Sequence, residues 1–547
     1  MSTALRHSWW QDLDAENFEW TIPAQFNIGE ACTDLQPSSD PALIVDSGDS
    51  TRVFSFGELG ELSRKFVALL DSFGLAAEDR VAIMVPQGIE VLTAHLGGFR
   101  GGFITVPLSV KFAAEAVAYR VENSGSKVLV IDVANFDRLD MGPVRASGVQ
   151  KILVVGSEQS STFKQDEWTY DFWQAIDAVE PSKRPVETTA RSKAIIIYTS
   201  GTTGNPKGAL HSHQVLLAHM TSVRTTFDNA PQAGDVFWTP ADWAWIGGLF
   251  DVLFPALALG RPVVAFAGKF TAEDALRLMK RHSITSAFIP PTALKQMRSA
   301  GVESNHAVGT VCRTLATGGE ALGESLETWV NNTFGCPINE FYGQTEMNLT
   351  IGTSRAQRLT APGSMGRPFL GFEAALLDFD GVEVPTGEVG EICIKTGNPG
   401  EFLGYWNDAE KTRSKVYDGW IHTGDLARKD EHGDFWYSGR TDDVISTAGY
   451  RVGPSEVESC LATHPAVSMA AVIGVPDELR GQAVQAFIVP NPGYCGSDAL
   501  TKELQNHVKN KLAFYQYPRR INYLEELPMT TTGKIMRRSL REIVGSD

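Results

Sequence analysis

The chain of 547 residues is too long for a single hydrophobic core, so we expect two or more domains. Apolar residues make up 43% and charged residues 21% of the sequence, which is the composition of a globular protein in water. The formal net charge of −17 argues against a nucleic-acid partner or an anionic membrane surface, because both would require clustered Lys and Arg.

The N-terminal stretch 1–20 is not predicted to be a signal peptide, because it carries several acidic residues and lacks an apolar core. No uncharged apolar run reaches the roughly 18–20 residues that a membrane span requires. The six cysteines lie far apart without a Cys-x-x-Cys pair, a distribution typical of reduced, packed thiols. We therefore expect a cytoplasmic protein without a membrane span.

The first 200 residues alternate between helical and strand-like patterns. In 55–74, apolar residues recur at helical spacing, Ser55 and Glu58 form a capping box, and Gly74 can end the helix. The alternation that follows, strand and helix in turn, predicts parallel β-α-β units in a doubly wound sheet. The remaining predicted elements are a strand at 80–86, a helix at 90–102, a strand at 103–108, a helix from about residue 113 and a strand at 127–132.

The stretch YTSGTTGNPKG, residues 198–208, follows a β-branched strand and precedes an apolar helix predicted over residues 212–227. Its glycines and hydroxyls can surround phosphate oxygens, and Lys207 adds a positive charge. A Walker-type loop would carry Ser or Thr after the lysine, where this chain has Gly208. The alternative is a flexible linker, but ligands bind at the carboxyl ends of parallel strands. We therefore predict a phosphate-binding loop.

The sequence changes character from about Arg367, where short strand-like segments are interrupted by Gly, Asp and Pro. This pattern predicts a barrel-like antiparallel piece. A compact α+β pattern follows, in which Ser455 and Glu458 are expected to form a second capping box. We predict an α/β fold with a large N-terminal domain of doubly wound sheets plus the barrel-like piece, 1–440, and a small mobile C-terminal domain, 441–547.

Six segments, in chain order, closely resemble the motifs of the adenylate-forming superfamily, which includes acyl-CoA synthetases, firefly-type luciferases and peptide-synthetase adenylation domains. They are YTSGTTGNPKG (198–208), ATGGEAL (316–322), FYGQTE (341–346), GWIHTGDLA (419–427), SGRTDDVISTAGYRVGPSEVE (438–458) and PMTTTGKIMRR (528–538). The resemblance implies that ATP activates a carboxylic acid as an acyl-adenylate, with release of pyrophosphate. A thiol would then take the acyl group and release AMP.

The resemblance also assigns roles in the nucleotide site. Lys207 would hold the β- and γ-phosphates, Thr345 the α-phosphate and Glu346 a Mg²⁺ ion. Asp425 would bind the ribose hydroxyls, although alone it would be interpreted as a turn residue. Lys534, otherwise a solvated lysine, would contact the substrate carboxylate and the α-phosphate. The positions implied for ATP or AMP binding are Thr199, Ser200, Gly201, Thr202, Thr203, Gly204, Gly318, Gly319, Glu320, Phe341, Tyr342, Gly343, Gln344, Thr345, Asp425 and Arg440.

The implied acceptor is coenzyme A, because the chain is most similar in character to acetyl- and medium-chain acyl-CoA synthetases. Asp442 matches the position about which the C-terminal domain of the family rotates between the two half-reactions. Gly449, Tyr450 and Arg451 match the segment that contacts coenzyme A after rotation. One alternative is a free-standing adenylation enzyme that loads a carrier-protein phosphopantetheine. The other is a non-catalytic acyl- or nucleotide-binding relative.

The acyl pocket is expected to include Trp243, Trp245, Gly318 and Gly343. Glycine at 343 should open space beyond a methyl group, whereas the two tryptophans should limit its depth. Core packing is the alternative for both tryptophans. These features favour a short- to medium-chain carboxylic acid, including branched or heteroatom-substituted acids.

Three further expectations concern histidines and regulation. His211 and His213 can share a strand face, but they lack a third ligand nearby, so packing or hydrogen bonding is preferred to metal binding. His422 is expected to be structural for the same want of partners. The resemblance raises the hypothesis that a protein acyltransferase modifies Lys534. The sequence leaves the oligomeric state open, and a homo-oligomer is one option.

Overall fold

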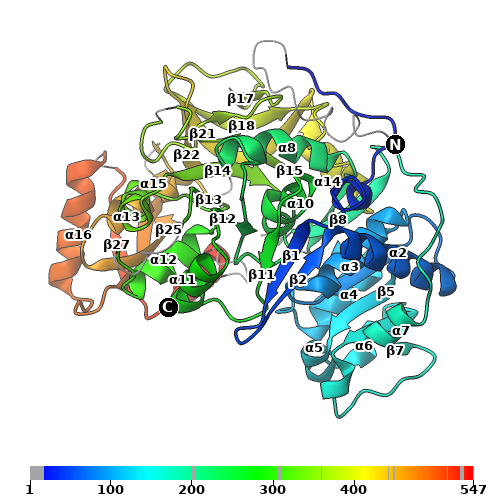
Figure 1. Cartoon of the computed structure of the whole chain (residues 1–547). Coiled ribbons are helices and arrows are strands. Elements are labelled where there is room, and N and C mark those ends of the chain that lie inside the picture. Colours follow the sequence, from blue (N-terminus) through cyan, green and yellow to red (C-terminus); the bar gives the residue numbers. More distant parts are fainter. Residues whose placement is uncertain are drawn as a thin grey trace.

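The computed structural model describes residues 18–199, 205–304, 311–358, 360–441, 443–447, 450–477, 479–513, 515–529 and 535–545. Figure 1 shows two large sheets with helices packed against them, a smaller barrel-like sheet, and a C-terminal group of strands and helices. This arrangement confirms the predicted α/β class with a barrel-like piece and a C-terminal α+β unit.

The first large sheet contains eight strands, which are β3 (Arg80–Met84), β4 (Ile104–Pro107), β5 (Ser126–Asp132), β6 (Lys151–Val155), β7 (Thr169–Asp171), β8 (Lys193–Thr199), β9 (Lys207–Ser212) and β19 (Gly404–Tyr405). Their order is β19-β9-β8-β4-β3-β5-β6-β7. β3 to β8 pair in parallel, as the alternation of helix and strand predicts. β9 and β19 add antiparallel pairs beyond β8.

The second large sheet contains nine strands, which are β1 (Pro41–Asp46), β2 (Thr51–Ser55), β10 (Phe237–Trp238), β11 (Val263–Ala265), β12 (Ser286–Phe288), β13 (Thr314–Gly318), β14 (Ile338–Gln344), β15 (Met347–Gly352) and β16 (Arg367–Pro368). Their order is β16-β15-β14-β13-β12-β10-β11-β1-β2. The central strands are parallel and β14–β15 is an antiparallel hairpin. The turn between these two strands contains residues 345 and 346, which belong to the predicted site motif 341–346.

The barrel-like sheet contains β17 (Ala374–Leu377), β18 (Val389–Lys395), β20 (Val416–Tyr417), β21 (Trp420–Lys429) and β22 (Phe435–Arg440), all antiparallel to their neighbours. β21 is the central strand of this sheet, because it pairs with β18, β20 and β22. It carries the predicted ribose-binding motif, and the β21–β22 register sets Asp425 opposite Arg440. The barrel-like sheet therefore presents one of its strands to the same site.

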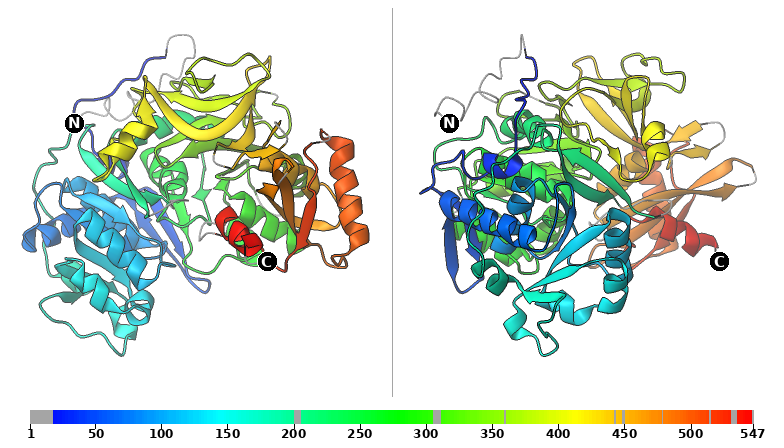
Figure 2. Two further views of the ribbon diagram at one scale, coloured as in Figure 1. Left: turned by 180° about the vertical axis from the view of Figure 1, so that it is seen from behind. Right: turned by 90° about the vertical axis from the view of Figure 1, so that its right-hand side faces the viewer.

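The C-terminal unit contains β23 (Ile445–Thr447), β24 (Tyr450–Val452), β25 (Val467–Asp477), β26 (Gly481–Pro490) and β27 (Arg520–Tyr523). Its two hydrophobic clusters contain only residues from 445 to 544, so its described core is built from its own chain segment. Figure 2 shows these elements, orange to red, gathered on one side of the molecule.

Helices cover the sheets, and their apolar residues fill a core that spans both large sheets and the barrel-like sheet. The predicted capping box at Ser55 and Glu58 is confirmed at the start of the second helix, and Gly74 follows its end. The α-helices are α1 (Ile28–Ala31), α2 (Phe56–Ser72), α3 (Ile89–Arg100), α4 (Ala114–Ser124), α5 (Val133–Arg138), α6 (Met141–Ala146), α7 (Phe172–Asp177), α8 (Val215–Thr226), α9 (Ile246–Gly248), α10 (Phe254–Ala258), α11 (Ala272–Arg281), α12 (Pro291–Ser299), α13 (Glu324–Phe334), α14 (Ala409–Lys415), α15 (Pro454–Ala462), α16 (Asp498–Lys511) and α17 (Arg537–Gly545).

The structure departs from the expected elements at two points. The last residues of the predicted loop 198–208 already belong to a strand, because β9 begins at Lys207 and pairs antiparallel with β8 before α8 begins. The run GALHS is completely buried, so it forms an inner strand of the sheet. The second capping box is also absent, because α15 starts at Pro454 with Gly453 as its N-cap. Glu458 instead binds Arg537 and the backbone N–H of Val472.

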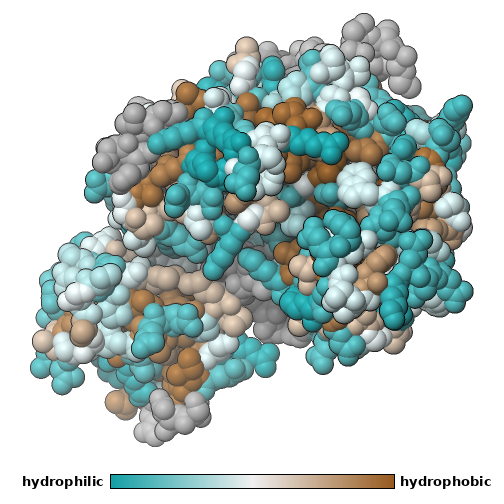
Figure 3. Space-filling view, turned by 60° about the horizontal axis from the view of Figure 1, so that its bottom comes forward, coloured by the Kyte–Doolittle hydropathy of each residue, from teal (hydrophilic) through white to brown (hydrophobic). Residues whose placement is uncertain are grey.

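Within the described part of the chain, no helix is both long and apolar enough to cross a membrane. The face drawn in Figure 3 is mainly hydrophilic, with hydrophobic residues in separate patches. This agrees with the composition and with the acidic net charge.

Candidate active site

The three sheets of the N-terminal part meet at the β14–β15 turn. His211 on β9 contacts the backbone oxygen of Thr345 through Nε2 at 2.7 Å. The amide of Phe402, just before β19, donates to the backbone oxygen of Glu346 at 3.0 Å. From the other side, Gln344 Nε2 donates to the backbone oxygen of Thr423 on β21 at 2.9 Å. The turn is therefore held by the first large sheet and by the barrel-like sheet together.

Asp425 is a buried carboxylate with donors on several sides. It accepts hydrogen bonds from Tyr342 Oη at 2.7 Å and Gln344 Nε2 at 2.5 Å, and Arg440 Nη1 lies 3.4 Å away. Burial and the charge of Asp425 both raise the pKa of Tyr342. These contacts bring together three predicted nucleotide-site motifs, 341–346, 419–427 and 438–458. They fix the orientation of a carboxylate that can accept hydrogen bonds from hydroxyl groups.

Glu346 and Lys207 approach each other through Tyr405. The Tyr405 hydroxyl donates a hydrogen bond to the Glu346 carboxylate, and Lys207 Nζ lies 4.8 Å from the centroid of the tyrosine ring. Burial, followed by the charge of Glu346, raises the pKa of Tyr405 above its ordinary value. Thr199 Oγ1 lies 3.4 Å from the backbone oxygen of Lys207. The end of the predicted phosphate loop and the predicted metal ligand thus share one corner of the site.

Lys415, at the end of α14, is a site residue that sequence reasoning missed. Its Nζ donates to Gln344 Oε1 at 2.8 Å and to the backbone oxygen of Thr423 at 3.0 Å. Burial lowers the pKa of Lys415, while the charges of Glu346 and Asp425 act in the opposite direction. Lys207 and Arg440 also lie close enough to affect this pKa. The two acidic residues of the site are thus surrounded by cations.

No motif signalled either Lys415 or Tyr405. Lys415 follows Thr-Arg-Ser in a helix whose other residues are mostly exposed, which is a common pattern for solvated helix ends. Tyr405 precedes a tryptophan in a segment outside all six motifs. The basic residue in the last turn of α14 and the aromatic residue on β19 acquire their positions from strand pairing, which spacing alone does not reveal.

The predicted adenine segment 316–322 lies at the end of β13, beside β14. A Cβ atom on Gly318 would approach the Phe341 ring to 2.4 Å and the Phe341 backbone oxygen to 2.7 Å, so only glycine permits this close packing. Gly319 adopts φ +85° in the turn that follows. Glu320 accepts a hydrogen bond from Thr292 Oγ1 at 2.8 Å and faces Lys295. The segment is therefore tightly positioned next to 341–346.

The residues predicted for the acyl end include one correction. A Cβ atom on Gly343 would lie 2.6 Å from Asn348 Oδ1 and 2.7 Å from the Leu349 nitrogen. The space expected beyond Gly343 is therefore filled by β15, because the side-chain direction at 343 points at the neighbouring strand. Trp243 is fully buried, whereas Trp245 is partly buried with its ring 6.0 Å from that of Phe112.

A buried polar cluster behind Gly343 was not predicted. Asn348 donates a hydrogen bond to Asp251, and His219 Nε2 lies 3.2 Å from Asn348 Nδ2. Burial raises the pKa of Asp251 well above its ordinary range and lowers the pKa of His219 to about 3. Both groups are therefore favoured in their neutral forms, and the cluster supplies hydrogen-bonding groups rather than charge.

Several predicted residues lie outside the described part of the chain. These are Ser200, Gly201, Thr202, Thr203, Gly204, Asp442, Gly449 and Lys534. Tyr450 and Arg451 belong to β24, where the Tyr450 ring is exposed and stacks on Tyr515 at 4.1 Å. The predicted coenzyme A segment is thus described only in part.

One of the two predictions for the histidines is confirmed and the other is wrong. His211 and His213 make hydrogen bonds, to the Thr345 oxygen and from the Ile28 amide, so the preferred interpretation is confirmed. The expectation that His422 lacks partners is wrong. Its Nδ1 lies 3.1 Å from Glu391 Oε2 and 3.4 Å from Cys393 Sγ, because both residues share its face of the barrel-like sheet.

Comparison with known proteins gives the same picture over nearly the whole chain. Residues 31–406 match the AMP-binding enzyme family, and residues 456–534 match the AMP-binding enzyme C-terminal domain. The chain is 33% identical over 541 residues to the mitochondrial acyl-coenzyme A synthetase ACSM3 of Rattus norvegicus, covering 96% of this chain and 92% of that protein. It is 33% identical over 504 residues to the acetyl-coenzyme A synthetase of Bacillus subtilis, covering 91% and 86%.

Solved structures agree. A Brucella canis acyl-CoA synthetase has a TM-score of 0.73 with 32% identity, over 95% of this chain and 94% of that one. The anthranilate CoA ligase AuaEII in complex with anthranoyl-AMP has a TM-score of 0.86 with 26% identity, over 96% and 99%.

Proposed function

The chain belongs to the family of AMP-binding enzymes and is an AMP-forming acid–CoA ligase, and on this premise we propose that it activates a short- to medium-chain carboxylic acid. The observation that carries the proposal is the convergence of Lys207, Glu346, Asp425 and Lys415 at the β14–β15 turn. A triphosphate and a carboxylate repel each other, so a site that joins them needs oriented donors and cations.

The first half-reaction follows from this arrangement. A substrate carboxylate oxygen attacks the α-phosphorus of ATP, the bond from that phosphorus to the bridging oxygen breaks, and pyrophosphate leaves. Asp425 would hold the ribose, and its contact with Arg440 Nη1 at 3.4 Å helps to orient the carboxylate. Lys207 would bind the phosphates and Lys415 would compensate the charge of the transition state. Thr345 would bind the α-phosphate.

Glu346 fits a Mg²⁺ ion by its chemistry. Its carboxylate offers hard oxygen ligands, and Mg²⁺ is usually bound by one or two carboxylates with phosphate and water. Among the described residues, Tyr405 is the hydrogen-bond donor to this side chain, through one of its two oxygens. Glu346 would hold the ion, which would supply positive charge against the phosphate oxygens.

For the second half-reaction, we propose that residues 441–547 rotate as a unit about Asp442. Two features support this proposal. The hydrophobic clusters of the unit contain no residue before 445, and contacts between α15 and β22 link it to the rest of the chain. Lys534 would serve adenylation, whereas Gly449, Tyr450 and Arg451 would contact coenzyme A during thioester formation.

The size of the acid is inferred from a relative and from the residues of the acyl end. The relative named acetyl-coenzyme A synthetase and the two tryptophans favour a small acyl group. The polar cluster of Asp251, Asn348 and His219 behind Gly343 is buried and hydrogen-bonded within itself, so it gives no argument for a substituent on the acid. We also propose a cytoplasmic location. Acylation of Lys534 and a homo-oligomeric state stay predictions.

Pyrophosphate exchange across a panel of acids tests the proposal. The panel runs from acetate to octanoate and includes hydroxy- and amino-substituted members and benzoate, each followed by assays with coenzyme A and with a phosphopantetheinylated carrier protein. We expect exchange and thioester formation with coenzyme A to peak together on a short or medium acid. Exchange followed by transfer to the carrier alone would favour the carrier-loading alternative. No exchange with any acid would favour the non-catalytic relative.

A further inference from the structure

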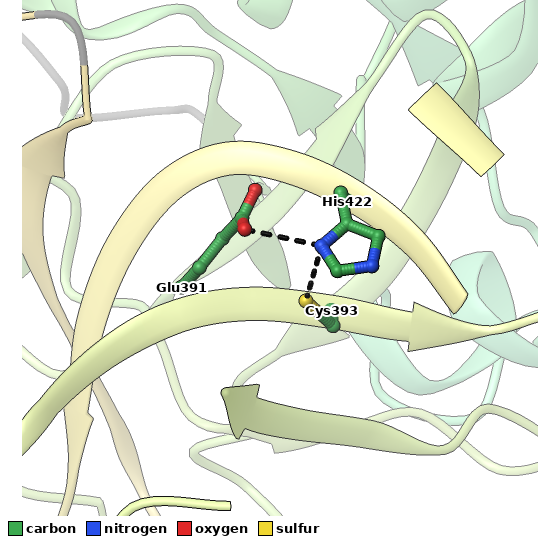
Figure 4. A group of neighbouring side chains, drawn as sticks. All are labelled: Glu391, Cys393 and His422. Atoms are coloured by element: carbon green, nitrogen blue, oxygen red, sulfur yellow. Dashed lines mark hydrogen bonds and ion pairs between the residues drawn. The ribbon is translucent and has the colours of Figure 1, made fainter. Parts of the chain in front are cut away.

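A cysteine, a histidine and a glutamate meet on the face of the barrel-like sheet that points away from the main core. Cys393 on β18 and His422 on β21 are direct cross-strand partners, and Glu391 lies two residues before the cysteine. Figure 4 shows the three side chains pointing toward one another. In the described part of the chain they form the one group of three or more potential ligands whose donor atoms all lie within 4.8 Å of one another.

The alternation of the strands explains the convergence. Ile392, Ile394 and Ile421 point into the main core, so their neighbours Glu391, Cys393 and His422 point to the opposite face. The register shifts between Glu391 and Cys393, which re-aims the glutamate toward the histidine. Backbone geometry therefore holds the group together, and long flexible side chains are not needed to assemble it.

The distances suit a tetrahedral metal ion. Cys393 Sγ lies 3.4 Å from His422 Nδ1, which lies 3.1 Å from Glu391 Oε2. With Zn–S of about 2.3 Å and Zn–N or Zn–O of about 2.0–2.1 Å, a tetrahedron has ligand–ligand edges of roughly 3.3–3.6 Å. The two edges that meet at His422 Nδ1 thus need adjustments of only a few tenths of an ångström, and the three donor atoms all lie within 4.8 Å of one another.

The surroundings orient each ligand. The ring of Tyr417 stacks on His422 with centroids 3.7 Å apart and an interplanar angle of 4°. Glu391 uses its other oxygen, Oε1, to accept the backbone N–H of Gly424 at 2.7 Å, which leaves Oε2 toward the histidine. Cys393 is fully buried and His422 nearly so, whereas Glu391 is about one-fifth exposed and opens the group to solvent. Such outer contacts are what fixes metal ligands in position.

The state of the thiol without metal is also defined. Burial and the charge of Glu391 raise the pKa of Cys393 to about 12, so the free group is a protonated thiol. A metal ion must therefore displace that proton, as it does at other thiolate sites.

We propose that Glu391, Cys393 and His422 form a binding site for a thiophilic divalent cation, best matched by Zn²⁺, through Oε2, Sγ and Nδ1, with water as the fourth ligand. On binding, the S–H bond breaks, the Sγ–Zn bond forms and the proton passes to solvent, without redox change. Sulfur and imidazole ligands select Zn²⁺ over the hard ion Mg²⁺. The site is therefore distinct from the Mg²⁺ ligand Glu346, and it does not depend on which acid the enzyme uses.

Metal titration of the full-length chain tests the inference. Metal-free protein without nucleotide, since ATP chelates metals, is titrated with Zn²⁺ against a chromophoric chelator and, separately, with Co²⁺ while thiolate-to-metal charge transfer is recorded. We expect one equivalent of tightly bound Zn²⁺ and a charge-transfer band in the wild type. Cys393→Ser should abolish the band and weaken Zn²⁺ binding by at least roughly 10²-fold. Glu391→Gln should weaken it less, because water can replace one oxygen ligand.

Two matched controls separate the site from surface binding. Cys495→Ser removes an exposed thiol, and His432→Gln removes an exposed imidazole. Both should bind Zn²⁺ like the wild type. Zn²⁺ should also raise the melting temperature of the wild type and of both controls, but not that of Cys393→Ser. Should Cys393→Ser fail to fold, Glu391→Gln and His422→Gln carry the same comparison. A charge-transfer band that persists in Cys393→Ser, or wild-type protein that binds no Zn²⁺, would overturn the proposal.

Discussion

Lys415 offers the sharpest test of how the site works, because neither a motif nor its exposed helix marks it. Its Nζ donates to Gln344 Oε1 and to the backbone oxygen of Thr423. Gln344 in turn donates to Asp425 at 2.5 Å. Replacing Lys415 with methionine keeps most of the stem, removes the charge, and frees Gln344, which contacts the carboxylate of Asp425 that we propose to bind the ribose.

The expected magnitude follows from these contacts. A hydrogen bond from a charged group contributes about 1.5–3 kcal/mol, and part of this loss is recovered when water reaches the half-buried position. A loss of about 1.4–2.8 kcal/mol in ATP binding corresponds to a rise in the KM for ATP of roughly 10- to 100-fold. The kcat should fall less, because Lys207 and Arg440 stay in place.

The thermal stability of Lys415→Met is a second, independent measurement. Burial lowers the pKa of Lys415, so the folded protein without nucleotide is destabilised by this cation. Removing the charge relieves that cost, while the acceptors on Gln344 and Thr423 lose a donor. The two effects oppose each other, and the melting temperature should change little. Weakened ATP binding with unchanged stability is the signature of a residue retained for function.

Pyrophosphate exchange at varied ATP measures the effect, with thermal melting on the same samples. Lys411→Met is the matched control, since Lys411 lies one turn earlier on α14 and is exposed beside Asp408. Lys415→Arg should restore part of the ATP affinity, because it keeps the charge and changes the donor geometry. A melting temperature lowered by several degrees with an unchanged KM for ATP would show that Lys415 only supports the fold, and the reasoning would be refuted.

Four further outcomes are expected. Tyr405→Phe removes the donor to Glu346, so the Mg²⁺ concentration for half-maximal exchange should rise about fivefold, as loss of about 1 kcal/mol implies. Lys534→Ala should reduce adenylate formation by at least roughly 10²-fold and spare thioester formation from pre-formed acyl-adenylate. Asp442→Pro should retain pyrophosphate exchange and lose thioester formation, because proline restricts the backbone there. His95→Asn should reduce the dependence of stability on pH between about pH 7.5 and pH 5, measured by denaturant unfolding.

The sign of the last prediction comes from burial. Burial lowers the pKa of His95 to about 3 in the folded protein. In the unfolded chain the same imidazole is protonated near pH 6.5, whereas in the folded chain it stays neutral at this pH. Stability is therefore lost as pH falls below 6.5, and at about pH 5 the cost is about 2 kcal/mol for this group. The variant should lack that loss. An unchanged difference between the two pH values would contradict the assignment.

Each of the other three predictions can also be contradicted by a specific result. An unchanged Mg²⁺ requirement in Tyr405→Phe would mean that Glu346 is positioned without its help. Equal loss of both half-reactions in Lys534→Ala or in Asp442→Pro would contradict the division of labour between the two orientations of the C-terminal unit. Thr412→Ala, on α14 near β19, is a control for local packing around Tyr405.

The resemblance implied that 341–346, Asp425 and Arg440 belong to one nucleotide site, and the structure brings them together. Asp425 and Arg440 face each other because β21 and β22 pair in fixed register, whereas Tyr342 and Gln344 reach Asp425 through their side chains from β14, a strand of the second large sheet. The alternation of helices and strands likewise predicted the parallel part of the first sheet. In these regions the local pattern and the tertiary structure agree, so the arrangement could be predicted from the sequence.

The errors arise where a neighbouring element decides the environment. Gly343 lacks a side chain, but the strand that fills the space beside it comes from the return of the chain at Asn348 and Leu349. β9 begins inside the predicted loop, at Lys207, because its antiparallel pairing with β8 decides where the strand starts. Ser455 and Glu458 have capping-box spacing, but Gly453 and Pro454 already begin the helix.

A single strand, β21, connects the nucleotide site to the proposed metal site. Its inward residue Asp425 is held by Gln344, and its outward residue His422 faces Glu391 and Cys393. Glu391 also accepts the N–H of Gly424, the residue directly before Asp425. An ion that draws Glu391 toward His422 would therefore act on the backbone that carries the ribose-binding carboxylate. Wild-type protein loaded with one equivalent of Zn²⁺ and freed of excess metal should have a KM for ATP different from that of the metal-free protein, whereas the same treatment should leave the KM of Cys393→Ser unchanged.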